Sequence, residues 1–235
     1  SLLERCILSS GSYHKLKEQY RMHDKICDVV SERFYNGSLI TNKEISRIRR
    51  QTSAHPLVWV STFGAEDVSE RSKSYYNQEE VDACVRVAKS LRGKDPFSSI
   101  AILAFYRGQV QEVAKRVGEE ERVEVMTVDS CQGSEFEHVV LSLVRSNRMG
   151  KLGFVKDKQR INVAISRAKK SLVIVGNERM ASSDEDWAAV CRACESLPLD
   201  SFDLSSFPPP PPPLVKKDVP RAPPMEGGAR LPVYS

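Results

Sequence analysis

Several motifs that would bind a nucleotide or a metal are missing from this sequence. No GxxxxGK[ST] phosphate-binding loop occurs, because Gly150-Lys151 is followed by Leu152 and no glycine stands at the required upstream spacing. The GxGxxG and HExxH patterns are missing too. The chain therefore cannot cradle a triphosphate alone, which excludes a free-standing nucleotide enzyme such as a small kinase. It could still complete a site that another domain begins.

Long apolar runs are also missing. The sequence holds no stretch of 18 apolar residues, so we expect no membrane-spanning helix and no membrane partner. The opening SLLERCILSS carries an acid and a base in its apolar run and no small-residue cleavage site, which excludes a signal peptide. This opening indicates a cut inside a larger protein. The cysteines, read as buried reduced thiols, favour a protein of the cytoplasm or the nucleus.

Cysteine is too sparse for a structural zinc site. Cys191-x-x-Cys194 is a close pair, but a four-cysteine site needs a second pair and the sequence has none. Both cysteines fall on the apolar stripe of a predicted helix with Trp187 and Val190, which favours core packing. All six cysteines stand in apolar runs, as buried reduced thiols do. We predict no metal site in the chain.

The overall charge is only +4, with 35 Lys and Arg against 31 Asp and Glu. That total is too small to indicate a nucleic-acid partner. The distribution is more informative, because the segment from Arg145 to Lys170 holds nine basic residues and one acid, Asp157. Such a run can be a binding surface or an ordinary solvated face, and the sequence leaves both open.

Five short apolar runs predict strands that are covered on both faces: LVWVST (57–62), SIAILAF (99–105), VEVMTV (123–128), HVVLSLV (138–144) and SLVIVG (171–176). Helical patterns lie between them. The first helix begins at Asn77 with a capping-box-like Glu80 and ends at Gly93. A second helix follows Arg107, a third runs from about Lys158 to Arg167, and a fourth begins near Ser183. Strands that alternate with helices predict a three-layer α/β fold with a mostly parallel sheet.

Composition divides the chain into three parts. Residues 1–19 indicate an arm that leads into the domain, and residues 20–200 form the α/β domain. Residues 201–235 carry ten of the 13 prolines and almost no periodicity, which predicts a disordered tail with polyproline II character at 208–213. The tail is interpreted as a spacer. A ligand for an SH3- or WW-type partner is the alternative, for which proline-rich composition is not a specific signal.

Four segments carry the most chemistry. They are QYRMH (19–23), ILAFYRGQ (102–109), VMTVDSCQGSEFEHVVLS (125–142) and RINVAISRAKK (160–170). The third predicts a buried strand that ends at Thr127, a tight polar turn through Asp129 to Gly133, and a new strand after Glu135. In the fourth, Arg160 and Arg167 stand seven apart on a predicted helix, so both guanidinium groups should project to one surface and suit a polyphosphate.

These four segments, in this order and spacing, resemble the second RecA-like domain of superfamily 1 helicases, in the group that contains senataxin and the nonsense-mediated-decay RNA helicase. The resemblance extends from residue 1 to about residue 194, and SLLER resembles the segment after motif III of that group. It implies a first RecA-like domain upstream in the same protein, which would carry the phosphate-binding loop. It also implies ATP and Mg²⁺ as cofactors, with Mg²⁺ bound mainly by the first domain, and movement from 5′ to 3′ along single-stranded RNA or DNA.

The resemblance also implies a role for individual residues. Arg167 would be the arginine finger, with Arg21 near the γ-phosphate and Gln132 near the triphosphate. The two remaining nucleotide contacts would be Tyr20 on the adenine and Glu135 on the ribose. At the opposite edge of the cleft, Thr127 would contact the nucleic-acid backbone.

Each of these residues has an ordinary structural alternative, such as a capping role for Arg21, a solvated strand start at Glu135 or a structural ion pair at Arg160. The sequence also departs from the group: Cys131 replaces an aromatic residue, Asp24 a common proline, and motif IV reads AFY. None of these changes removes a phosphate-contacting group. The leading hypothesis is half of an ATP-driven motor that is inactive alone. The alternative is an ATPase-inactive RecA-like module that docks a nucleic acid or a protein.

Overall fold

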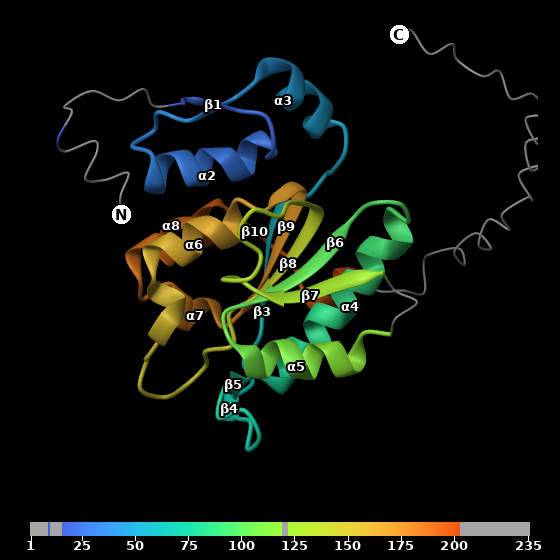
Figure 1. The fold of residues 1–235 in the computed structure, drawn as a ribbon, viewed down its shortest axis with the longest axis vertical. Helices are drawn as coiled ribbons and strands as arrows, with labels where there is room; N and C mark the ends of the chain where they lie inside the picture. The colour runs from blue at the N-terminus through green and yellow to red at the C-terminus, as the bar shows by residue number, and fades with distance from the viewer. Residues whose placement is uncertain (1–8, 10–15, 119–121, 203–235) are drawn as a thin grey trace, which may run out of the picture.

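The computed structural model describes residues 9, 16–118 and 122–202. Its centre is a six-stranded sheet in the order β10-β3-β9-β8-β6-β7, in which every neighbouring pair is parallel (Figure 1). The strands are β3 (Leu57–Ser61), β6 (Ile100–Ala104), β7 (Val123–Thr127), β8 (Phe136–Ser142), β9 (Ala168–Gly176) and β10 (Glu195–Ser196). The predicted α/β class and parallel sheet are confirmed, and all five predicted runs are strands.

Helices cover both faces of this sheet, which makes three layers (Figure 1). On one face lie α4 (Gln78–Lys94) and α5 (Arg107–Arg116); on the other lie α2 (Asp24–Phe34), α6 (Lys158–Ile165) and α8 (Glu185–Ala193). Alternate side chains of β9 serve the two layers, with Leu172 and Ile174 in the α2 layer and Val173 and Val175 in the α4 layer. Two cores explain why the strands are apolar throughout rather than alternating.

Shorter elements surround the sheet. β1 (Glu18–Gln19) pairs in parallel with β2 (Ile40–Thr41), and β4 (Asp67–Val68) pairs antiparallel with β5 (Tyr75–Tyr76). The remaining elements are α3 (Lys43–Arg50), η2 (Gly153–Lys156), α7 (Glu178–Ala181) and η3 (Leu199–Phe202). Within the described residues, no helix has the length and apolarity needed to cross a membrane.

The start of α4 differs from the capping box that the sequence indicates. Asn77 is the N-cap, and its side chain accepts a hydrogen bond from the backbone N–H of Glu80 at 3.2 Å. The Glu80 carboxylate turns inward instead of returning the bond, and accepts from the Ser142 hydroxyl at 2.6 Å and the Val144 N–H at 2.7 Å. Asn77 N–H is satisfied instead by the Gln109 side chain at 2.8 Å. Glu80 therefore ties α4 to the carboxyl end of β8.

The predicted tight turn after Thr127 is a crossover in the structure. β7 and β8 both flank β6 in parallel, so residues 128–135 must lead from the carboxyl end of β7 to the amino end of β8. Val128 and Cys131 are buried in the core of the α2 layer on the way. The result is that Thr127 and Glu135, eight positions apart, lie at opposite edges of the sheet.

The described chain ends in a packed element. Phe202 is 6% exposed and lies in the core beneath α4, while Arg86 of α4 forms an ion pair with Asp200 at 3.0 Å. The predicted start of the tail at residue 201 is wrong, because Ser201 and Phe202 belong to η3. The rest of the predicted tail, 203–235, lies outside the described residues, as does most of the predicted arm 1–19.

Candidate nucleotide-facing site

Three predicted site residues come together at the edge of the sheet where β8 and β9 begin. Arg21 precedes α2, Glu135 precedes β8, and Arg167 precedes β9. Arg21 Nε donates to Glu135 Oε2 at 2.7 Å, and Arg21 Nη1 donates to the backbone carbonyl of Ser166 at 3.2 Å. This edge is where parallel strands begin, whereas ligands of open α/β sheets usually bind where strands end.

The Arg167 side chain is held by three hydrogen bonds. It donates to the carbonyl of Val163 at 2.9 Å, to the carbonyl of Ser134 at 3.0 Å and to the hydroxyl of Ser166 at 2.9 Å. Burial lowers the pKa of Arg167, and the neighbouring charge of Arg21 lowers it further. Three of its five N–H groups are used in these bonds. The guanidinium is thus fixed in orientation next to a second cation.

Glu135 balances part of this positive charge. Its two carboxylate oxygens pair with Arg21 and with Lys169 Nζ, both at 2.7 Å. Hydrogen bonds from Lys169 and Arg21 hold the pKa of Glu135 below its usual range. A ribose hydroxyl that approaches Glu135 would share these oxygens with two cations.

The segment that carries Arg21 is positioned by the side chain of Gln19. Gln19 Oε1 accepts from the N–H groups of Arg21 and Met22 at 2.7 and 2.8 Å, and Nε2 donates to Thr41 Oγ1 at 2.6 Å. His23 then caps α2, and its backbone N–H donates to the Lys169 carbonyl at 2.8 Å. The QYRMH segment therefore connects β2, α2 and β9 in one place.

The other predicted residues lie further out. Tyr20 is 60% exposed and its hydroxyl donates to Glu18 at 3.0 Å, so most of its ring faces solvent. Gln132 is exposed on the crossover between β7 and β8. Thr127 ends β7 at the opposite edge of the sheet, where its hydroxyl donates to Ser130 Oγ at 2.9 Å. Thr127 therefore lies at the end of the sheet opposite to the arginine cluster.

The helical spacing argument for Arg160 and Arg167 is wrong, because α6 ends at Ile165 and Arg167 lies beyond it. Arg160 forms a two-pronged ion pair with Asp129 at 2.8 and 3.1 Å, whereas Arg167 bonds to Ser134. The arginine that joins Arg167 is Arg21, from the other end of the chain.

Comparison with known proteins agrees with this architecture. A family model described as AAA domain matches residues 1–179. The ATP-dependent helicase upf1 of Schizosaccharomyces pombe is 32% identical over 267 aligned residues, which cover 100% of this chain and 29% of that protein. The ATP-dependent helicase NAM7 of Saccharomyces cerevisiae is 31% identical over 204 residues (80% of this chain, 21% of that protein). The probable helicase senataxin of Homo sapiens is 36% identical over 195 residues (79% and 7%).

The chain belongs to the AAA domain family of superfamily 1 helicases. The resemblance seen in the sequence is confirmed. The chain spans less than a third of the length of each of these relatives.

The basic run of this helicase domain is divided between both sheet edges. Arg145 is buried, pairs with Glu66 at 2.9 Å and lies 4.3 Å from the centre of the Tyr75 ring. Lys170 pairs with Asp95 at 2.8 Å at the other edge. Several charges of the run are therefore structural, and the exposed ones are Arg148, Lys151, Lys156 and Lys158.

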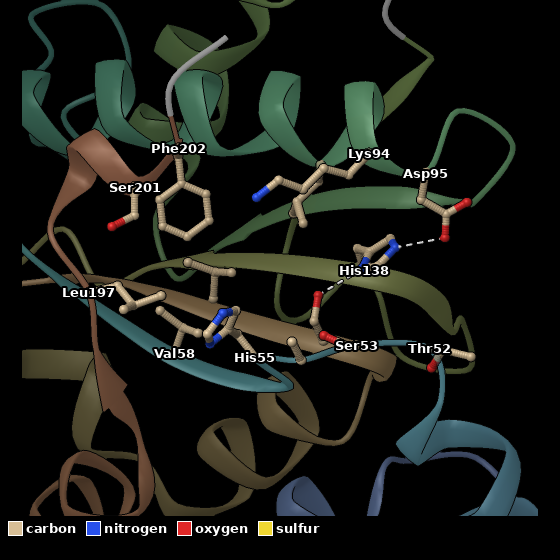
Figure 2. Close-up of a pocket in the computed structure, with 14 residues that line it drawn as sticks. Thr52, Ser53, His55, Val58, Lys94, Asp95, His138, Leu197, Ser201 and Phe202 are labelled. Carbon is tan, nitrogen blue, oxygen red and sulfur yellow. Dashed lines mark hydrogen bonds and ion pairs between the residues drawn. The ribbon is translucent and has the colours of Figure 1, made fainter. Parts of the chain in front are cut away.

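A cavity of about 520 Å³ lies apart from the predicted site, between η3, the end of α4 and strands β3 and β9 (Figure 2). His138 reaches it from β8, with Nδ1 2.7 Å from Ser171 Oγ and Nε2 3.2 Å from Asp95 Oδ2. Burial lowers the pKa of His138. None of the predicted site residues lines this cavity.

Sequence reasoning gave no role to Lys169 or Ser134, which complete the cluster. Lys169 stands in the fourth segment and was visible there, as one more basic residue in a run. Ser134 contributes a backbone carbonyl, for which a sequence carries no signal. Cys191 and Cys194 are partly buried against the core as predicted. Within residues 16–118 and 122–202, no group of three or more His, Cys, Asp or Glu side chains could hold a metal ion.

Proposed function

We propose that this chain is the second motor domain of an ATP-dependent superfamily 1 helicase. Its arginines would complete an ATP site whose phosphate-binding loop lies in an upstream RecA-like domain of the same protein. The observation that carries this proposal is the pair Arg21 and Arg167, 146 positions apart in sequence, which meet on Ser166.

The charge of Arg21 lowers the pKa of Arg167, so the two guanidinium groups repel each other. Glu135 is shared between Arg21 and Lys169, so the cluster keeps an excess of positive charge. An anion placed between the arginines would relieve the repulsion. The terminal phosphate of a nucleotide is such an anion, and guanidinium groups bind its oxygens with paired N–H donors.

In the proposed mechanism, water attacks the γ-phosphorus in line with the leaving diphosphate. Negative charge then spreads over the transferred oxygens, and fixed cations stabilise it. Arg167 is already oriented by Val163, Ser134 and Ser166, so its ordering is complete before the nucleotide arrives. Arg21 would contact the same phosphate, with Gln132 near the triphosphate.

Tyr20 and Glu135 would make the remaining nucleotide contacts. The exposed ring of Tyr20 would stack on the adenine, and Glu135, the ion-pair partner of Arg21, would bind a ribose hydroxyl. Mg²⁺ would be held mainly by the first domain and would supply positive charge that neutralises the phosphates. At the other edge of the sheet, Thr127 would contact the backbone of single-stranded RNA or DNA.

The test compares the 235-residue chain with a longer protein that includes an upstream domain with GxxxxGK[ST]. Phosphate release is measured with and without single-stranded RNA and single-stranded DNA. The proposal expects strand-stimulated release from the longer protein. A longer protein that has an intact phosphate-binding loop, yet releases no phosphate with either strand, would overturn it in favour of a docking module.

A further inference from the structure

Phe154 is an exposed aromatic residue at the end of the sheet that carries Thr127, as is Phe63 two positions after β3. Phe154 lies in η2, on the connection between β8 and α6, and is 60% exposed. Exposure of an apolar ring is unfavourable in water.

The backbone next to Phe154 is tightly packed at Gly153. Gly153 has φ +60°, and a Cβ at this position would lie 2.5 Å from Arg145 Nη1 and 2.7 Å from Tyr106 Oη. Phe154 N–H donates to the Tyr106 hydroxyl at 3.3 Å, and that hydroxyl also accepts from Arg145 Nη1 at 3.1 Å. The backbone at Phe154 is therefore held against the buried side chains of Tyr106 and Arg145.

The Phe154 ring also has a charged neighbour that links it to the turn after β7. The Arg160 guanidinium lies 5.0 Å from the ring centre, and both prongs of that guanidinium pair with Asp129. Asp129 stands two positions after Thr127, in the turn that Ser130 closes onto Thr127. Two consecutive contacts thus connect Phe154 through Arg160 to Asp129, in the same turn as Thr127.

The connection that carries Phe154 is mainly basic, with Asp157 as its one acid. Arg148, Lys151 and Lys156 are exposed on the same connection, and Met149 beside them is 71% exposed. An exposed ring and cations on one connection suit single-stranded nucleic acid. Its bases stack on aromatic rings, and its phosphates bind cations. The same combination does not match a protein partner with an apolar surface, which would leave these charges unpaired.

We propose that Phe154 is a stacking platform for one base of single-stranded nucleic acid, with Arg148, Lys151 and Lys156 as phosphate contacts. This site deepens the proposed function and rests on it for the identity of the strand. The ring takes any base, because every base has an aromatic face, so the platform holds the strand in place without reading its sequence.

The experiment measures binding of the 235-residue chain to fluorescein-labelled oligouridine and oligothymidine by anisotropy, without nucleotide. Phe154→Ala should raise Kd about fivefold or more, since one base stack is lost. Phe154→Trp should keep Kd close to that of the unchanged chain, because the indole ring stacks as well. Phe97→Ala removes a ring that is 84% exposed on another loop, and should leave Kd unchanged.

Salt dependence separates stacking from charge. The slope of log Kd against log salt should stay the same in Phe154→Ala, and should fall by about 0.7 in Arg148→Ala, which removes one phosphate contact. An oligonucleotide with a fluorescent base analogue should be quenched by the unchanged chain and less by Phe154→Ala.

The stacking proposal is overturned if Phe154→Ala binds like Phe97→Ala, if its salt slope falls with its affinity, or if the unchanged chain binds neither strand. Thermal melting of each variant shows whether a loss of binding comes from unfolding, and Phe154→Trp gives a second folded variant for the same question. Strand-stimulated phosphate release by the longer protein is measured separately. A normal rate there together with an unaffected Phe154→Ala would reject the platform and keep the motor.

Discussion

Arg21 and Arg167 both donate hydrogen bonds to Ser166, the first to its carbonyl oxygen at 3.2 Å and the second to its hydroxyl oxygen at 2.9 Å. One residue at the end of α6 thus holds two like charges from distant parts of the chain. Neither hydrogen bond neutralises a guanidinium charge. Glu135 forms an ion pair with Arg21 and not with Arg167. The arrangement is suited to an anion that arrives from outside the domain.

If both arginines serve one phosphate, their loss should not be additive. In a longer protein with the upstream domain, Arg167→Ala should lower kcat severely, since arginine fingers contribute roughly 10³ to 10⁵ in turnover. Arg21→Ala should be similarly damaging, and the double variant should lose much less than the product of the two effects. The measurement is single-strand-stimulated phosphate release, alongside nucleotide-free binding by anisotropy.

The matched control for these variants is Arg116→Ala, which removes an exposed ion pair with Asp82 on α4 and α5. It should keep normal turnover. Strand binding should survive in all of the variants, because Thr127 and Phe154 lie at the opposite edge of the sheet. Normal turnover in Arg167→Ala would remove it as the finger and direct attention to Arg160. Loss of binding together with turnover would withdraw the catalytic assignment.

The isolated chain should fold and hydrolyse no ATP. A complete parallel sheet with two cores supports cooperative melting, while the sequence has no phosphate-binding loop. Thermal melting followed by circular dichroism and a phosphate-release assay check both halves of this expectation. Robust turnover by material free of contaminating ATPase would contradict the half-site model.

Four of the five longer strands could be predicted because they are largely buried on both faces and so are mostly apolar, which sets them apart from the helices. β7 is the exception: it is the last strand of the sheet and Glu124 is exposed on it, so the prediction that this strand is covered on both faces was wrong. α4, α5 and α8 could be placed for a different reason, since each begins with a recognisable pattern or N-cap, such as Asp184 before α8. The short strands β1, β2 and β10 could not be predicted. Two-residue strands such as Glu18–Gln19 have no periodicity to detect.

The arginine cluster could be predicted only through the family resemblance. Nothing local to Arg21 indicates Arg167, because their proximity depends on the whole α/β topology. The helical argument that paired Arg160 with Arg167 was wrong for a local reason: α6 stops at Ile165, where the chain turns into β9. The crossover after Thr127 could not be recognised either, since the order of strands in the sheet decides its path.

Glu80 should make stability fall as the pH rises. Burial raises the pKa of Glu80 from 4.5 to about 8, so below pH 4.5 the carboxyl is protonated in both the folded and the unfolded chain. As the pH rises from 4.5 to about 8, Glu80 loses its proton in the unfolded chain but keeps it in the folded chain. The unfolded chain is therefore stabilised relative to the folded one. The contribution lost by pH 8 is about 4 kcal/mol in the free energy of unfolding.

Glu80→Gln mimics the protonated carboxyl and should flatten that part of the pH profile, with Glu124→Gln on the exposed face of β7 as its control. Urea denaturation at a series of pH values gives the difference in unfolding free energy between Glu80→Gln and the unchanged chain. The difference should grow with pH in favour of Glu80→Gln. A constant difference would show that Glu80 is ionised in the folded protein at neutral pH.

The stable domain should extend through Phe202 and no further. Residues 203–235 are rich in proline and offer little apolar surface to repay the cost of ordering, so deleting them should leave Tm nearly unchanged.

Deleting from residue 199 onward also removes Phe202, which is 6% exposed beneath α4, and the ion pair between Arg86 and Asp200. Burying a phenylalanine contributes about 2 kcal/mol, so this longer deletion should lower Tm by roughly 4 to 8 °C. Phe202→Ala in the full chain should reproduce most of that drop. Equal melting of the two truncated chains would mean that η3 adds no stability, and a large drop on removing 203–235 alone would mean that the proline-rich segment docks on the domain.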